Sequence, residues 1–87
     1  MQYQIRLRAV VQKQLDKLTG PSYEASASAI ASLEPEPRPP KVKKLADSGL
    51  WRVRVGHFRI IYRIYDEERL IIVVRIAKRA EDTYKGL

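Results

Sequence analysis

The 87-residue chain, with 45% apolar residues, is long enough for one compact domain spanning residues 1–87 and too short for two hydrophobic cores. Its 17 basic and 10 acidic residues leave a net charge of +7, which indicates a polyanionic partner such as nucleic acid or an acidic protein. The absence of cysteine excludes disulfides and thiolate metal sites, and a single histidine argues against a zinc site, so we expect no metal and no cofactor.

The N-terminal residues are predicted to form a strand and then an amphipathic helix. Residues 1–8 alternate apolar and polar side chains, as a strand with one buried face does. From Ala9 the period changes, and the recurrence of Val11, Leu15 and Leu18 predicts a helix of about three turns. This segment lacks the apolar core and cleavage site of a signal peptide. No apolar run in the chain approaches the roughly 20 residues that span a bilayer, so we expect a cytoplasmic protein without membrane contact.

A second helix is predicted to follow directly. Gly20 and Pro21 form a stop and a restart, because glycine accepts a left-handed cap and proline suits a first helical turn. The apolar stripe of this helix is expected to contain Tyr23, Ala27, Ile30 and Leu33. Its opposite, solvent-facing side is expected to contain Ser22, Ser26, Ser28 and Ser32. Because the two helices are joined so tightly, they should form an antiparallel hairpin.

A proline-rich segment, residues 34–40, separates the helices from the C-terminal half of the chain. Its prolines exclude helix and central strand, since each removes a backbone donor and restricts φ. We interpret it as an extended strap within the domain, and a polyproline ligand for a partner is the alternative. Residues 41–45 are basic and predict a short edge strand with Val42 and Leu45 facing inward, and residues 46–49 predict a turn.

The remaining sequence predicts a three-stranded meander over residues 51–55, 58–65 and 70–77. The last of these strands is almost continuously apolar, so we expect it to be central and covered on both faces. Glu81 and Asp82 are expected to begin a final short helix. Together the elements predict an α+β fold: a small, mostly antiparallel β-sheet with an N-terminal strand and a helical hairpin packed on one face.

Arginines interrupt the apolar strands at regular spacing. With the helices on the apolar face, Arg52, Arg54 and Arg59 should share the opposite face with basic residues of the last strand. Those residues are Arg75 and Arg79, which share one parity, and Lys78, which has the other. Clustered guanidinium groups repel one another unless an anion lies among them, and phosphate matches the arginine fork. Phosphate binding is our hypothesis, and a solvated basic face without a specific ligand is the alternative.

The other polar residues receive structural interpretations. Asp66, Glu67 and Glu68 lie in a predicted turn, Glu34 and Glu36 lie among the prolines, and no pair is spaced like a general acid and base. Metal-dependent hydrolysis is therefore not expected. His57, at a hairpin tip, is interpreted as a turn residue, and Trp51 as a core anchor of the sheet.

Residues 33–84 resemble the RelE/ParE superfamily of bacterial toxin–antitoxin toxins, and RelE more than ParE. The matching elements are a proline-rich helix exit, the block KLADSGLWRVRVGHFRIIYRI and the terminal AKRAEDTY. With the preceding strand and helix pair, the resemblance covers nearly the whole chain. It implies a RelE-like, microbial RNase-type fold. It also implies an mRNA interferase, a metal-independent endoribonuclease that cleaves mRNA in the ribosomal A site by attack of the ribose 2′-hydroxyl on the adjacent phosphate and so inhibits translation.

The resemblance assigns catalytic roles to five residues. Arg52 and Arg54 match paired basic residues that are often lysines; arginine keeps the electrostatic clamp but is a poor proton acceptor. Arg59 matches the phosphate-binding arginine. Arg79 matches the arginine that stabilises the leaving side and is a candidate proton donor. Tyr84 matches the tyrosine that stacks on or orients the scissile nucleotide and is a candidate base, and the alternative for Tyr84 is a residue that closes the edge of the core.

The candidate nucleic-acid-binding residues are Arg52, Arg54, Arg59, Arg75, Lys78, Lys41, Lys43 and Lys44. The expected partners are mRNA, the ribosome and a cognate antitoxin that is acidic at the contact. A ParE-like DNA gyrase inhibitor without nuclease activity is the first alternative. A plain RNA-binding module is the second, and it is disfavoured because the predicted open face has few aromatic residues besides Tyr65 and Tyr84.

Overall fold

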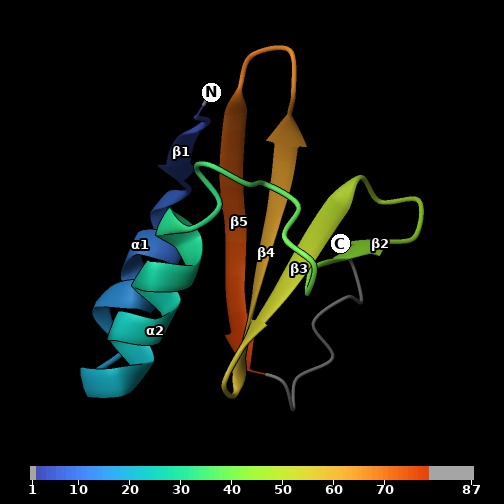
Figure 1. Cartoon of the computed structure of the whole chain (residues 1–87). Coiled ribbons are helices and arrows are strands. Elements are labelled where there is room, and N and C mark those ends of the chain that lie inside the picture. Colours follow the sequence, from blue (N-terminus) through green and yellow to red (C-terminus); the bar gives the residue numbers. More distant parts are fainter. Residues whose placement is uncertain (1, 79–87) are drawn as a thin grey trace.

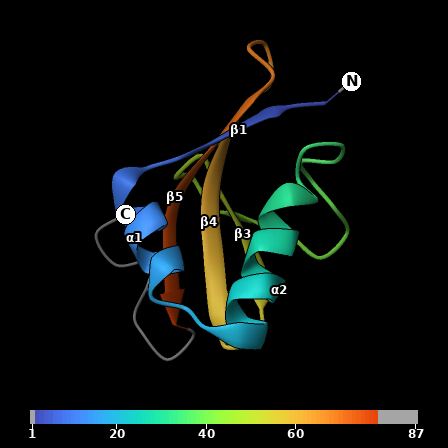
Figure 2. The same cartoon turned by 90° about the vertical axis from the view of Figure 1, so that its left-hand side faces the viewer.

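The structure of the chain, a computed structural model, describes residues 2–78 as a five-stranded sheet with two helices on one of its faces. In chain order the elements are β1 (Gln4–Leu7), α1 (Ala9–Asp16), α2 (Gly20–Ala31), β2 (Lys43–Leu45), β3 (Leu50–Val55), β4 (Phe58–Tyr65) and β5 (Leu70–Lys78). The two helices run in opposite directions on the same side of the sheet (Figures 1 and 2). The predicted α+β class with a helical hairpin on one face is confirmed. Within residues 2–78, neither helix has the length and hydropathy needed to cross a bilayer.

The strands lie in the order β1-β5-β4-β3-β2. β1 pairs with β5 in parallel, and every other neighbouring pair is antiparallel. β5 is an interior strand, as predicted, but the middle of the sheet belongs to β4. The expectation that β5 is covered on both faces is only partly met, because Ile71 and Val73 are fully buried under the helices whereas Ile72, on the other face, is only partly buried.

α1 is shorter than its sequence pattern predicts. It has eight residues and ends at Asp16, with Val11 and Leu15 buried. Leu18 lies beyond the helix but still packs against the core. The expected break at Gly20 is confirmed, because its φ of +52° is in the left-handed region that favours glycine.

α2 is rotated relative to the predicted stripe. Tyr23 is 43% exposed, whereas Ser26 is fully buried together with Ile30 and Leu33. The prediction that Ser26 faces solvent was therefore wrong, and so was the inward position of Tyr23. α2 contains mostly small residues, so its apolar stripe is weakly defined, and packing against β3 favours a small side chain at the closest approach.

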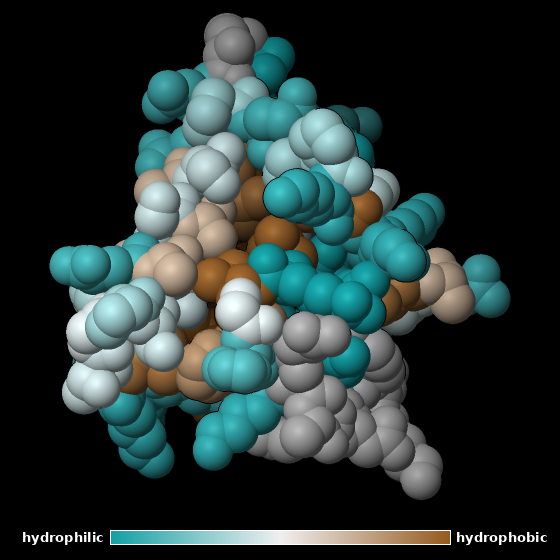
Figure 3. All heavy atoms as spheres, turned by 60° about the horizontal axis from the view of Figure 1, so that its bottom comes forward, coloured by the Kyte–Doolittle hydropathy of each residue, from teal (hydrophilic) through white to brown (hydrophobic). Residues whose placement is uncertain are grey.

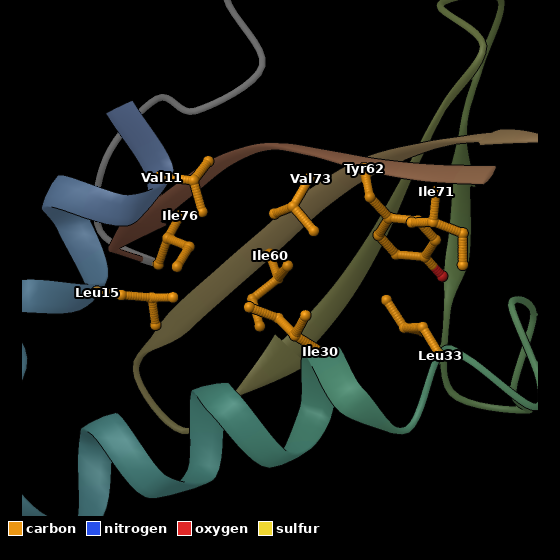
Figure 4. Close-up of a cluster of buried hydrophobic side chains, with 9 residues drawn as sticks. All are labelled: Val11, Leu15, Ile30, Leu33, Ile60, Tyr62, Ile71, Val73 and Ile76. Atoms are coloured by element: carbon orange, nitrogen blue, oxygen red, sulfur yellow. The ribbon is translucent and has the colours of Figure 1, made fainter. Parts of the chain in front are cut away.

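One cluster of apolar side chains between the helices and the sheet forms the core (Figure 4). Its buried members are Val11, Leu15, Ile30, Leu33, Ile60, Tyr62, Ile71, Val73 and Ile76. Tyr62 is the largest fully buried side chain, and burial raises its pKa well above the usual value. Its hydroxyl donates a hydrogen bond of 2.8 Å to the backbone oxygen of Pro37. The core thus reaches the proline-rich connector that runs from α2 to β2 (Figure 1) and holds it in place, as expected of a strap.

Candidate nucleic-acid interface

The pairing of β3 with β4 gathers arginines on the side of the sheet opposite α1 and α2. Val53 pairs with Ile60, and Ile60 is a core residue under the helices. Arg52 and Arg54, which flank Val53, therefore point to the opposite face, because successive side chains of a strand alternate. Arg54 pairs directly with Arg59 on the neighbouring strand. The prediction that these three arginines share one face agrees with this register.

We call this side of the sheet the arginine face. Its members on β3 to β5 are Leu50, Arg52, Arg54, Arg59, Ile61, Arg63, Tyr65, Leu70, Ile72, Arg75 and Ala77. These strand residues include no carboxylate and no histidine. Within the described part of the strands, the face can therefore hold an anion but offers no ordinary general base.

A β-bulge brings Arg75 to the arginine face. Val73 faces the helices and pairs with Tyr62, and strict alternation from Val73 would send Arg75 into the core as well. Instead the register shifts between Ile61 and Tyr62, so that Ile61 pairs with Arg75 and Val74 has no opposite residue. The extra residue reverses the parity of the strand beyond it.

Arg52 occupies the most buried position among the charged groups of this face. It is 7% exposed, and it lies beside Ile61, which pairs with it and is fully buried. Its Nε atom is buried and has no hydrogen-bond partner within the described part of the chain. A guanidinium cannot lose its proton under ordinary conditions, so a buried one is stabilised by a nearby anion or by aligned dipoles.

The neighbouring arginines are more accessible. Arg54 is exposed, and Arg59 and Arg75 are partly buried. Each of these three interacts with another group of the protein. The arginine face therefore combines the buried charge of Arg52 with neighbouring guanidinium groups, each of which can donate two parallel hydrogen bonds. This arrangement suits a phosphate group.

The lysines predicted to bind nucleic acid are divided between different surfaces. Lys43 pairs with Arg52 and so shares the arginine face, and Lys41 lies exposed in the turn before β2. Lys44 pairs with Trp51 and points away from that face, with its Nζ atom 6.0 Å from the centroid of the Trp51 ring. Lys78 pairs with Phe58 on the helix side. The structure thus brings Lys43 to the arginines and separates Lys44 and Lys78 from them.

Lys78 lies beside a groove at the end of the molecule where β5 finishes. The groove has a volume of about 330 Å³ and is lined by Gln14, Lys17, Leu18, Phe58, Ile76, Ala77 and Lys78. Hydrophobic residues reach the surface at this end among hydrophilic ones (Figure 3). Arg79 and Tyr84, to which the resemblance assigns catalytic roles, lie outside the described residues, as do Glu81 and Asp82 of the predicted final helix.

Arg63 and Tyr65, which are not among the predicted site residues, also lie on the arginine face because of the alternation along β4. An ideal Cβ atom on Gly49 would lie 2.9 Å from Nη1 of Arg63, so the guanidinium rests against the backbone of the β2–β3 turn. Tyr65 is 39% exposed. The signal for both residues was the same period of two that identified Arg59.

A second group that the sequence pattern did not reveal joins three distant segments. Arg38 of the connector donates two hydrogen bonds to Asp66, from Nη1 to Oδ1 at 3.1 Å and from Nη2 to Oδ2 at 2.8 Å. The hydroxyl of Tyr3 donates to Oδ1 of Asp66 at 2.7 Å. The Arg38 guanidinium also lies 5.0 Å from the centroid of the Trp51 ring. Asp66 thus has a structural role, and hydrogen bonds from Arg38 and then Tyr3 lower its pKa to about 2.

The contact between Arg38 and Asp66 should make stability sensitive to acid over a defined range. The pKa of Asp66 is lowered on folding from 3.8 to about 2, so its stabilising contribution is present above about pH 4 and is lost as the pH falls through this interval. At neutral pH we expect Asp66→Asn to melt at a lower temperature than the wild type, and we expect the difference to shrink toward zero as the pH approaches 2.

Thermal unfolding followed by circular dichroism at a series of pH values measures this difference. Asp47→Asn, which removes an exposed carboxyl group of the β2–β3 turn, is the matched control and should melt like the wild type throughout. A difference in melting temperature between the wild type and Asp66→Asn that stays constant with pH would contradict the stabilising role of the Asp66 carboxylate.

Comparison with known proteins gives consistent results. The family model described as the ParE toxin of the type II toxin–antitoxin system parDE matches residues 5–83. A putative toxin RelE1 from Methanocaldococcus jannaschii is 30% identical over 90 residues, which cover 99% of both chains. A chain of the archaeal RelE–RelB complex from Pyrococcus horikoshii is 29% identical, with a TM-score of 0.83 and coverage of 93% of this chain and 99% of that one.

A chain of the RelBE2 toxin–antitoxin complex from Mycobacterium tuberculosis is also similar, with 27% identity, a TM-score of 0.78 and coverage of 91% of this chain and 100% of that one. The family match spans most of the chain, and both structures share its arrangement of helices and strands. The predicted resemblance and the RelE-like fold are therefore confirmed. The chain belongs to the ParE toxin family within the RelE/ParE superfamily of type II toxin–antitoxin toxins, and its fold is RelE-like.

Proposed function

We propose that this toxin is a metal-independent mRNA endoribonuclease that cleaves mRNA in the ribosomal A site. The observation that carries the proposal is the direct pairing of Arg54 with Arg59 on the face opposite α1 and α2, with Arg52 and Arg75 on either side of Ile61 in the next row. Arginine forks at adjacent positions suit a phosphodiester whose charge increases in the transition state.

In this proposal the described residues hold the phosphate, and proton transfer depends on other groups. Arg54 and Arg59 stabilise the phosphorane-like transition state that forms when the ribose 2′-hydroxyl attacks. Arginine is a poor proton acceptor at neutral pH, so Tyr84 acts as the base or orients the nucleotide, and Arg79 stabilises the leaving oxygen. These last two roles come from the resemblance.

The proposed partners are mRNA, the ribosome and a cognate antitoxin, all encountered in the cytoplasm. The similar structures from Pyrococcus horikoshii and Mycobacterium tuberculosis are toxin–antitoxin complexes, which supports an antitoxin partner for this chain. A surface that carries Arg54 and Arg59 favours an antitoxin that is acidic at the contact.

A cell-free translation reaction tests the cleavage. Added toxin should produce new 5′ ends within the codons of translated mRNA, and primer extension maps them. Arg79→Ala and Tyr84→Phe should each slow cleavage by about 10² or more if they take part in proton transfer. Lys13→Ala, which removes a positive charge from the exposed side of α1, is the control and should cleave like the wild type. Intact mRNA in the presence of folded wild-type toxin would refute the proposal.

A ParE-like inhibitor of DNA gyrase without nuclease activity is the second candidate, and the match to the ParE toxin family supports it. Such an inhibitor would act by binding alone, so loss of the arginine side chains would weaken binding without any chemical step. A supercoiling assay with purified gyrase separates the two candidates. Inhibition of supercoiling together with intact mRNA would select the gyrase inhibitor.

A further inference from the structure

The arginine face continues beyond the residues to which cleavage is assigned. After Arg59, the next residues on this face of β4 are Ile61, Arg63 and Tyr65. They lie progressively farther from Lys78 and closer to the β4–β5 turn. Arg63 lies four residues from Arg59, or roughly 13 Å along the strand. One phosphate group cannot contact both guanidinium groups at that separation, so a ligand that engages both must extend along the sheet.

The guanidinium of Arg63 lies close to Gly49. Gly49 has a φ of +75°, and a Cβ atom at this position would lie 2.9 Å from Nη1 of Arg63. The absence of a side chain at Gly49 therefore leaves room for the guanidinium beside the β2–β3 turn.

An exposed aromatic ring lies on the same part of the face. Tyr65 follows Arg63 by two residues on β4 and is 39% exposed. Lys43 of β2 is also exposed, but it pairs with Arg52, which pairs with Ile61, so Lys43 lies level with the first arginines and not with Tyr65. A ring beside cations is the combination with which proteins bind single-stranded nucleic acid, because bases stack on the ring and phosphates pair with the charges.

We propose that Arg63 and Tyr65 form a second nucleotide subsite, which holds the base and phosphodiester that flank the cleaved bond in single-stranded RNA. The inference rests on the proposed function, because it extends the same substrate along the same face. An acidic protein segment is a less suitable ligand, since it would use the charge of Arg63 and leave the ring of Tyr65 without a stacking partner.

Binding of uncleavable RNA tests the subsite without depending on catalysis. Fluorescence anisotropy is measured with 2′-O-methyl oligonucleotides of about four and about ten nucleotides over a range of salt concentrations. Arg63→Ala should weaken binding of the longer oligonucleotide by about tenfold, and it should lower the slope of log K against log salt by about 0.7 for the lost phosphate contact. Tyr65→Ala should also weaken binding by about tenfold through lost stacking. Neither change should alter binding of the shorter oligonucleotide by more than about twofold.

Two pairs of variants separate the subsite from general effects. Gly49→Ala should displace Arg63 and weaken binding of the longer oligonucleotide, whereas Gly56→Ala should not. Both glycines have positive φ, and only a Cβ at Gly49 would meet a neighbouring atom, so the pair isolates the contact with Arg63. Tyr23→Ala removes a similarly exposed aromatic ring from α2 and should bind like the wild type.

The outcomes distinguish this proposal from the proposed function. Wild-type affinity of Arg63→Ala and Tyr65→Ala for the longer oligonucleotide overturns the subsite, even if the toxin cleaves mRNA. Loss of affinity in these variants only for an acidic antitoxin peptide also overturns it and assigns the residues to protein binding. If the wild type leaves translated mRNA intact but binds the longer oligonucleotide through Arg63, the subsite stands and the nuclease proposal fails.

Discussion

Replacement of Arg59 by alanine should reduce the rate of mRNA cleavage by about 10²–10³, which is the usual effect of removing one donor that stabilises transition-state charge. Arg59 lies directly opposite Arg54, so in the proposed mechanism the two guanidinium groups bind one phosphate from neighbouring strands. The phosphate gains negative charge as the 2′-hydroxyl attacks, and Arg59 therefore contributes more to the transition state than to the ground state. The rate constant of cleavage in single-turnover reactions on programmed ribosomes should fall. The affinity of the toxin for the programmed ribosome should change less.

The conservative variant Arg59→Lys sharpens this prediction. Lysine keeps the charge but has no planar fork, so we expect it to recover part of the activity that alanine loses. Arg54→Ala should have an effect of similar size, and the double variant should lose less than the product of the two single effects because both residues act on one group. Circular dichroism confirms that each variant is folded. If folded Arg59→Ala protein cleaves mRNA with the wild-type rate constant, the arginine pair does not stabilise the transition state.

Replacement of Tyr62 by alanine should have the largest effect on stability. Tyr62 is fully buried in the core, and the loss of a large aromatic ring from such a position typically costs about 3–5 kcal/mol. That amount is comparable to the whole stability of many domains of this size. Urea unfolding followed by circular dichroism should therefore show a much lower midpoint or an unfolded variant.

Tyr62→Phe separates the hydroxyl from the ring. This change removes only the hydrogen bond to the backbone oxygen of Pro37 and should cost about 1 kcal/mol. Tyr23→Ala, at an exposed position of α2, is the control and should change the free energy of unfolding by no more than about 0.5 kcal/mol. A loss below about 1 kcal/mol in Tyr62→Ala would mean that the core closes around the missing ring.

The strands could be predicted from the sequence because their period is local. β4 was predicted at its observed bounds, Phe58–Tyr65, and β3 and β5 each differ by one residue at one end. Alternation in these strands also assigned Arg52, Arg54 and Arg59 to one face without any knowledge of their neighbours. The break at Gly20 was equally local, since only its left-handed backbone was needed.

α2 was harder to predict because its composition barely distinguishes its sides. Tyr23 has a large apolar ring and was expected inside, but the surface of β3 decides which residue the helix can bring close. The small side chain of Ser26 fits there, and the tyrosine lies outside. The sequence pattern cannot decide which of these two residues is buried, because the fit depends on β3, which begins 24 residues after Ser26.

The contact of Arg38 with Asp66 and Tyr3 is a further case. The three residues come from the connector, the β4–β5 turn and the segment before β1, and nothing in their local sequence links them. They meet only because β1 pairs with β5 and the connector crosses to β2. A single carboxylate that accepts bonds from both partners then links these three segments.

The sequence by itself determined the fold class, the family and the alternation that separates arginines from apolar residues, because each of these depends on residue type and short-range spacing. Tertiary structure decided which charges act together. The bulge at Val74 turns Arg75 to the arginine face, and strand pairing separates Lys78 and Lys44 from it. The reason is physical: the register between strands depends on packing and hydrogen bonds across the whole sheet, and one extra residue reverses the direction of every side chain beyond it.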